Sequence, residues 1–154
     1  MEYSHGQHCT YLLTYHFVFV TKYRRKVLSD TVDEVIKEAA NKVASSACGA
    51  IVDYNSDEDH VHMLVSLPPN TNLSTFVRTL KTQTSRAVRS KCRDEISSQL
   101  WGDSFWSESY FAATTGTVSM EAVKQYIDSQ KTDSHRRKYV KKSNRRKPKA
   151  ETLQ

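Results

Sequence analysis

The chain has 154 residues, which is enough for one domain with a hydrophobic core and too few for two comfortable ones. Its hydrophobic share of 38% and charged share of 26% are typical of a soluble globular protein and exclude a disordered or fibrous chain. The formal net charge is +6, and no run approaches the ~20 apolar residues that a membrane-spanning helix needs.

The N-terminal segment 1–5 lacks the basic and then apolar layout of a signal peptide, so we expect a cytoplasmic protein. Three cysteines, Cys9, Cys48 and Cys92, are odd in number and widely spaced. Such a set favours neither a disulfide framework nor a CxxC zinc site, and it fits a reducing compartment.

The first predicted element is a central β-strand over residues 11–20, where nearly every residue is β-branched, aromatic or aliphatic. An amphipathic helix follows, capped by Asp30 and ending near Gly49. Its apolar residues recur at helical spacing: Val32, Val35, Ile36, Ala39, Ala40, Val43 and Ala44.

Residues 50–55 and 60–67 are two β-rich runs joined by a short polar segment, which predicts a hairpin. A second amphipathic helix is predicted after Pro69, because apolar residues recur at helical spacing from Leu73 to Val88. Its opposite face carries four basic residues: Arg78, Lys81, Arg86 and Arg89.

A strand near residues 110–114 and a closing helix complete the predicted elements. The order β-α-β-β-α-β predicts an α+β protein with a ferredoxin-like (RRM-like) sheet, helices on one face and an additional C-terminal helix.

The positive charge is concentrated at the C-terminal end. Residues 131–154 hold ten Lys or Arg against Asp133 and Glu151, whereas residues 1–130 hold thirteen basic and fifteen acidic residues. We therefore divide the chain into a domain over residues 1–131 and a basic, flexible tail over residues 132–154. Such a tail can attract phosphates, but it serves equally well as solvated surface.

Two pairs of residues carry the chemical signal. His60 and His62 alternate with Val61 on a predicted strand, so both imidazoles point to one face and can converge on a metal. Tyr126 and Gln130 lie one turn apart on the last helix, where a nucleophile and an amide oxygen can meet the same ion. Taken alone, each feature is more often structural: histidine pairs also occur as ordinary polar-face residues, and a helix tyrosine is more often a packed aromatic.

These residues resemble the TnpA-type single-tyrosine transposases of the HUH nuclease superfamily. His60-Val61-His62, preceded by Asp59, is similar to the family's histidine, hydrophobic, histidine motif, and the segment 123–130 is similar to its catalytic helix. The resemblance covers about residues 10–131, with no departure at the motif positions.

The resemblance implies a transposase that cleaves and rejoins single-stranded DNA at insertion-sequence ends through a 5′-phosphotyrosine. Tyr126 would be the nucleophile, His60 and His62 would be metal ligands, and Gln130 would be the third ligand. Two imidazoles and an amide oxygen suit Mn²⁺ better than Mg²⁺, and we expect either ion to work.

The resemblance also implies a homodimer in which the tyrosine helix of one subunit can complete the site of the other, and a substrate that contains DNA hairpins. Candidates for phosphate contact are the basic residues outside the tail. They are Arg24, Arg25, Arg78, Lys81, Arg86 and Arg89.

Two alternatives remain open from the sequence. One is a non-catalytic ferredoxin-like module that binds nucleic acid through its sheet and tail. The other is a related HUH nicking or replication-initiation protein, which would nick DNA without rejoining transposon ends.

Overall fold

The computed structural model describes residues 2–100, 104–114, 120–130 and 132. In chain order its elements are β1 (Ser4–His5), β2 (Thr10–Tyr11), β3 (Thr14–Val20), the 3-10 turn η1 (Lys22–Arg24), α1 (Asp30–Ser46), β4 (Ala50–Ser56), β5 (His60–Ser66), α2 (Leu73–Lys91), α3 (Arg93–Leu100), β6 (Phe111–Thr114) and α4 (Met120–Ser129).

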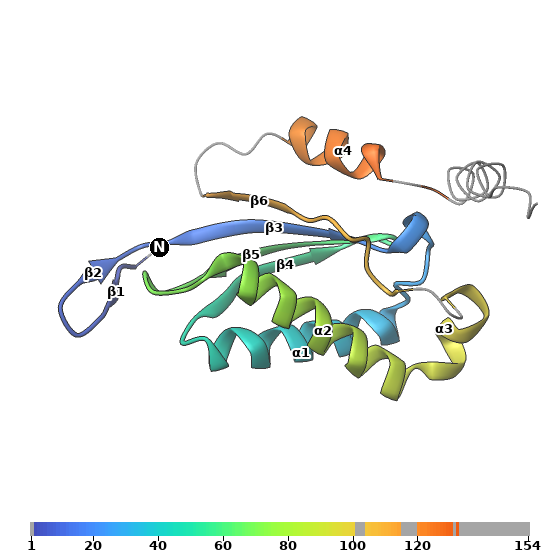
Figure 1. Ribbon diagram of the computed structural model, residues 1–154, viewed down its shortest axis with the longest axis horizontal. Coiled ribbons are helices and arrows are strands. Elements are labelled where there is room, and N and C mark those ends of the chain that lie inside the picture. Colours follow the sequence, from blue (N-terminus) through green and yellow to red (C-terminus); the bar gives the residue numbers. More distant parts are fainter. Residues whose placement is uncertain (1, 101–103, 115–119, 131, 133–154) are drawn as a thin grey trace, which may run out of the picture.

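Four antiparallel strands form the main sheet in the order β4-β5-β3-β6, and β1 pairs with β2 in a separate hairpin. Helices α1 and α2 cover one face of the sheet, while α4 lies on the other (Figure 1). From β3 to β6 the order is the predicted β-α-β-β-α-β with one additional helix, α3, between α2 and β6, and the α+β prediction is confirmed.

The main core lies between the sheet and the helix pair α1 and α2. Alternation along β3 and β5 directs one set of side chains into this layer, where Phe17, Phe19 and Met63 are almost fully buried. The helices contribute the apolar residues that repeat at helical spacing: Val32, Ile36, Ala40, Phe76, Val77, Leu80 and Val88.

Two boundaries differ from the sequence predictions. The central strand begins at Thr14, because Tyr11 pairs with Ser4 in the β1–β2 hairpin instead. The cap of α1 is Ser29 rather than Asp30, since the Ser29 hydroxyl accepts a hydrogen bond from the backbone N–H of Val32 at 3.3 Å.

Helix α3 was not predicted, because its eight residues are mostly polar and short of apolar repeats. Among the side chains of α3 that the structure describes, Ile96 is the one buried in the main core.

Of the predicted basic tail, Thr132 alone lies within the described residues, so the division at residue 132 stays a prediction. Within the described part of the chain, no helix is both long and apolar enough to cross a membrane.

Candidate functional site

Both predicted histidine ligands lie on the face of the sheet that carries α4. His60 pairs with Val20 and His62 with Val18 across the β3–β5 ladder, and directly opposed residues share a face. Val18 and Val20 contact α4, whereas Val61 between the histidines is buried in the core on the other face. The predicted same-face arrangement of the two imidazoles is therefore confirmed.

Asp59 orients His60. One carboxylate oxygen of Asp59 lies 2.8 Å from Nδ1 of His60, and because a carboxylate accepts hydrogen bonds, Nδ1 must carry the proton. In the neutral imidazole, the lone pair is then on Nε2 of His60. A carboxylate behind a histidine is the usual support of a metal-binding imidazole.

A third histidine on this face, His16 of β3, was missed from the sequence. Its Nδ1 lies 2.9 Å from Nε2 of His62, and the ring centroids are 5.2 Å apart. Burial, reinforced by the nearby charge of His16, lowers the pKa of His62. The neutral imidazole, which is the form that binds metals, is therefore favoured. The sequence offered one indication of this role, because His16 is a polar residue within the mostly apolar strand 14–20.

The tyrosine helix α4 packs on β3 through a small apolar patch. Val123 and Ile127 are buried against Val18 and Val20, as predicted for the core-facing side of this helix. The ring of Tyr126 packs beside the ring of Phe111 of β6, with centroids 5.7 Å apart.

Two serines in the segment before β6 hold the polar groups of α4. The hydroxyls of Tyr126 and Ser109 are 2.8 Å apart. The side-chain oxygen of Gln130 accepts hydrogen bonds from Ser107 at 2.7 Å and from Ser109 at 3.1 Å. Ser109 therefore joins the predicted nucleophile to the predicted third ligand. Nothing in the local sequence distinguishes these serines from other loop serines.

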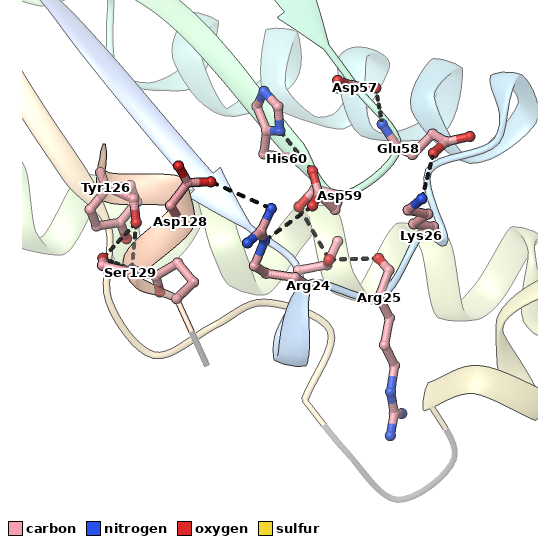
Figure 2. Close-up of polar contacts among 12 residues, drawn as sticks. Arg24, Arg25, Lys26, Asp57, Glu58, Asp59, His60, Tyr126, Asp128 and Ser129 are labelled. Carbon is pink, nitrogen blue, oxygen red and sulfur yellow. Dashed lines mark hydrogen bonds and ion pairs between the residues drawn. The ribbon is translucent and has the colours of Figure 1, made fainter. Parts of the chain in front are cut away.

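The two halves of the predicted site lie on opposite sides of β3. His60 and His62 belong to β5, while Tyr126 and Gln130 are bonded to the segment that leads into β6. Asp128 and Arg24 lie between Tyr126 and Asp59 (Figure 2). Among the described residues, no hydrogen bond links the tyrosine or the glutamine to either histidine.

The described part of one chain therefore does not bring the predicted metal ligands and the predicted nucleophile together. Within the described part of the chain, no three His, Cys, Asp or Glu side chains converge on one point. Burial also raises the pKa of Tyr126, although its hydrogen bond to Ser109 acts in the opposite direction. The phenolate is therefore not favoured in this arrangement.

The predicted phosphate-contacting residues are divided between the two faces. Arg24 and Arg25 follow β3 near His60, whereas Arg78 and Arg86 are exposed on α2, on the opposite face. Lys81 was predicted on the exposed side of α2 but is half-buried.

The ammonium of Lys81 donates hydrogen bonds to the carbonyl oxygens of Ser107 and Ser109, at 2.7 and 2.8 Å. Burial lowers the pKa of Lys81 to about 8. Lys81 thus holds the backbone of the segment whose serine side chains contact α4.

Comparison with known proteins gives consistent matches. Residues 9–130 match the family model described as IS200-like transposase. The ISDra2 transposase TnpA of Deinococcus radiodurans is 28% identical over 130 residues, covering 84% of this chain and 92% of the relative. A transposase for insertion sequence element IS200 of Salmonella typhimurium is 26% identical over 123 residues, covering 80% of each chain.

Two solved structures share the fold. A putative transposase from Deinococcus radiodurans superimposes with a TM-score of 0.73 at 30% identity, covering 84% of this chain and 98% of that one. A REP-associated tyrosine transposase bound to a REP hairpin superimposes with a TM-score of 0.50 at 16% identity, covering 80% of this chain and 69% of that one.

Proposed function

Because the chain belongs to the IS200-like transposase family, we propose that it cleaves and rejoins single-stranded DNA at insertion-sequence ends, with Tyr126 as nucleophile. The observation that carries this proposal is the shared sheet face: the histidine pair of β5 and the tyrosine helix α4 lie on the same face of the main sheet. A module that merely bound nucleic acid would not need a carboxylate-backed histidine pair beside a tyrosine helix.

His60 and His62 would hold a divalent metal, Mg²⁺ or Mn²⁺, with Gln130 as the third ligand. The donor set fits, because Asp59 fixes the tautomer of His60 and burial keeps His62 neutral. Such an ion would polarise the scissile phosphate and stabilise the charge of its transition state.

In the proposed reaction the Tyr126 oxygen attacks the phosphorus in line and the bond to the 3′ oxygen breaks. The products are a 5′-phosphotyrosine and a 3′-hydroxyl, which takes up a proton as the phenol loses one. Because one phosphodiester replaces another, the 3′-hydroxyl of a second strand can reverse the attack and rejoin DNA. Burial raises the pKa of Tyr126, and a positive charge close to the phenol would act in the opposite direction and favour the phenolate that attacks.

The separation of Tyr126 from His60 supports a homodimer with shared sites. Val123 and Ile127 bury against β3, and each such side chain contributes about 1.5–3 kcal/mol. This contact is small enough that α4 could be displaced and deliver Tyr126 and Gln130 to the histidine pair of a partner subunit.

DNA with hairpins is the proposed substrate. The REP-associated tyrosine transposase of the same fold is bound to a REP hairpin, which supports this choice. Arg24 and Arg25 follow β3 near His60 and would contact the DNA close to the scissile phosphate, whereas Arg78 and Arg86 would contact DNA that extends over α2. Lys81 would act through the segment 107–109 that it holds.

The test incubates the protein with labelled single-stranded hairpin DNA from the ends of its own element, in Mn²⁺ or Mg²⁺. We expect a denaturation-resistant protein–DNA adduct that disappears with chelator and with His60→Ala. His8→Ala, which removes an exposed histidine of the β1–β2 loop, is the matched control and should leave the adduct unchanged. No adduct on any element-end DNA would contradict the proposal.

A further inference from the structure

The chain turns sharply where β3 ends beside the histidine pair. Tyr23 and Arg24 both adopt left-handed backbone conformations, with φ of 58° and 54°. Non-glycine residues rarely adopt this conformation, and two in succession persist only where the surroundings hold them. The strain therefore marks this turn as a place where side-chain position matters.

Burial and hydrogen bonds hold the turn in place. Thr21 is fully buried, and its backbone N–H donates to the carbonyl oxygen of Asp59 at 2.9 Å. Its hydroxyl lies 2.7 Å from the carbonyl oxygen of Arg25 and 3.1 Å from that of Asp59. The backbone N–H of Lys22 donates to the carbonyl oxygen of Phe105 at 2.9 Å. These bonds tie the turn to the residue that precedes His60 and to the segment that leads to β6.

The strained turn places the guanidinium of Arg24 between two carboxylates (Figure 2). Its Nε lies 3.3 Å from one oxygen of Asp59, whose other oxygen accepts the hydrogen bond from His60. Its Nη2 lies 3.8 Å from a carboxylate oxygen of Asp128 on α4. A single side chain thus connects the histidine strand to the tyrosine helix.

We infer that Arg24 is a positioning residue that couples the placement of the tyrosine helix to the orientation of His60. Asp128 lies two residues after Tyr126 and two before Gln130, so a tie at Asp128 limits the movement of both. The effect of this coupling on strand transfer rests on the proposed function. The bridge itself is a property of the protein without DNA or metal.

The bridge distinguishes this role from a simple phosphate contact. Arg24 and Asp59 are largely buried, with 28% and 15% of their side chains exposed, whereas Asp128 is 57% exposed. A planar guanidinium can contact two carboxylates from different nitrogens, but a lysine ammonium on a shorter and differently shaped side chain cannot keep both contacts. A role that needed positive charge alone would tolerate lysine.

The experiment measures amide hydrogen exchange of α4 in the DNA-free, metal-free full-length chain. Arg24→Met, Arg24→Lys and Asp128→Asn should each speed exchange in α4 by about two- to fivefold, the range expected for a partly exposed ion pair. The double variant Arg24→Met/Asp128→Asn should exchange no faster than the faster single variant, because both remove the same tie.

Lys124→Gln is the matched control. It neutralises an exposed charge in the middle of α4, away from the helix ends, and its exchange should equal that of the unmodified chain. Wild-type exchange in Arg24→Lys or in Asp128→Asn would overturn the inference, and so would independent, multiplying effects of the two substitutions. The exposed position of Asp128 makes its variant informative even if a substitution of Arg24 impairs folding.

A second readout separates this inference from the proposed function. If the unmodified chain forms the tyrosine adduct, Arg24→Lys should change the rate of adduct formation in the same direction as Arg24→Met and by about as much, because both variants lose the bridge. Adduct formation in Arg24→Lys at the wild-type rate would overturn the coupling. If no adduct forms at all, the proposed function fails, while the exchange measurement still supports or refutes the bridge.

Discussion

The hydrogen bond between Trp106 and Thr84 should control the stability of the segment that carries Ser107 and Ser109. The indole N–H of Trp106 donates to the hydroxyl of Thr84 at 2.9 Å, and the two residues are 4% and 1% exposed. Thr84→Val preserves the shape of the side chain but leaves the indole N–H buried without an acceptor. Such a loss costs about 1–3 kcal/mol.

For a chain of this size, about 1 kcal/mol shifts Tm by about 2–4 °C. We therefore expect Thr84→Val, at about 1–3 kcal/mol, to lower Tm by about 2–12 °C in thermal unfolding followed by circular dichroism. The hydroxyl of Thr84 also donates to the carbonyl oxygen of Leu80 at 2.7 Å, but that carbonyl lies inside α2, so this loss adds little.

Thr79→Val is the matched control on the same helix. Thr79 is exposed and its hydroxyl donates to the carbonyl oxygen of Thr75 at 3.0 Å, so its replacement should change the free energy of unfolding by less than about 0.5 kcal/mol. Equal, small effects of Thr84→Val and Thr79→Val would refute the reasoning. A cycle with Trp106→Phe should show coupling between positions 84 and 106.

Three further results are expected. Gly49→Ala should destabilise the fold by about 1–3 kcal/mol in urea unfolding, because an added Cβ would lie 2.3 Å from the backbone oxygen of Ser66. Relative to Lys81→Met, the unmodified chain should gain stability as pH rises from about 8 to 10.5, because the unfolded chain binds more protons than the folded one in that window. Asp59→Asn should weaken Mn²⁺ binding, measured by calorimetry, about 10- to 100-fold through His60.

Each of these has a control or a contradicting result. Gly6→Ala meets the flexible side chain of Cys9 rather than backbone, so it should cost less than Gly49→Ala. Asp57→Asn removes an exposed carboxylate of the same loop, and metal affinity should not change. If the free energies of unfolding of the unmodified chain and of Lys81→Met differed by the same amount at every pH, the lowered pKa of Lys81 would be contradicted.

The strands and helices with a regular spacing of apolar residues could be predicted from the sequence. Alternation in residues 60–66 predicted both the strand and the common face of His60 and His62, because a strand repeats every two residues. Helical spacing likewise predicted that Val123 and Ile127 face the sheet. These features depend on a few neighbouring residues, so local sequence suffices.

The contacts that complete the site join distant segments and could not be predicted in this way. His16 meets His62 because of the β3–β5 register, which a single sequence does not reveal. Ser109 reaches Tyr126 because α4 folds back over β3. From the sequence, Arg24 was notable only for its positive charge, so a phosphate contact was the hypothesis. Its two carboxylate partners, Asp59 and Asp128, lie 35 and 104 positions away in the chain.

The central claim is that Tyr126 becomes covalently linked to DNA. The most direct measurement is mass spectrometry of the protease-digested adduct formed with element-end hairpin DNA and Mn²⁺. We expect a nucleotide joined through its 5′ phosphate to the peptide that contains Tyr126, and no such peptide from Tyr126→Phe. A nucleotide on another residue, such as Tyr110, or cleaved DNA with no linked peptide, would contradict the account.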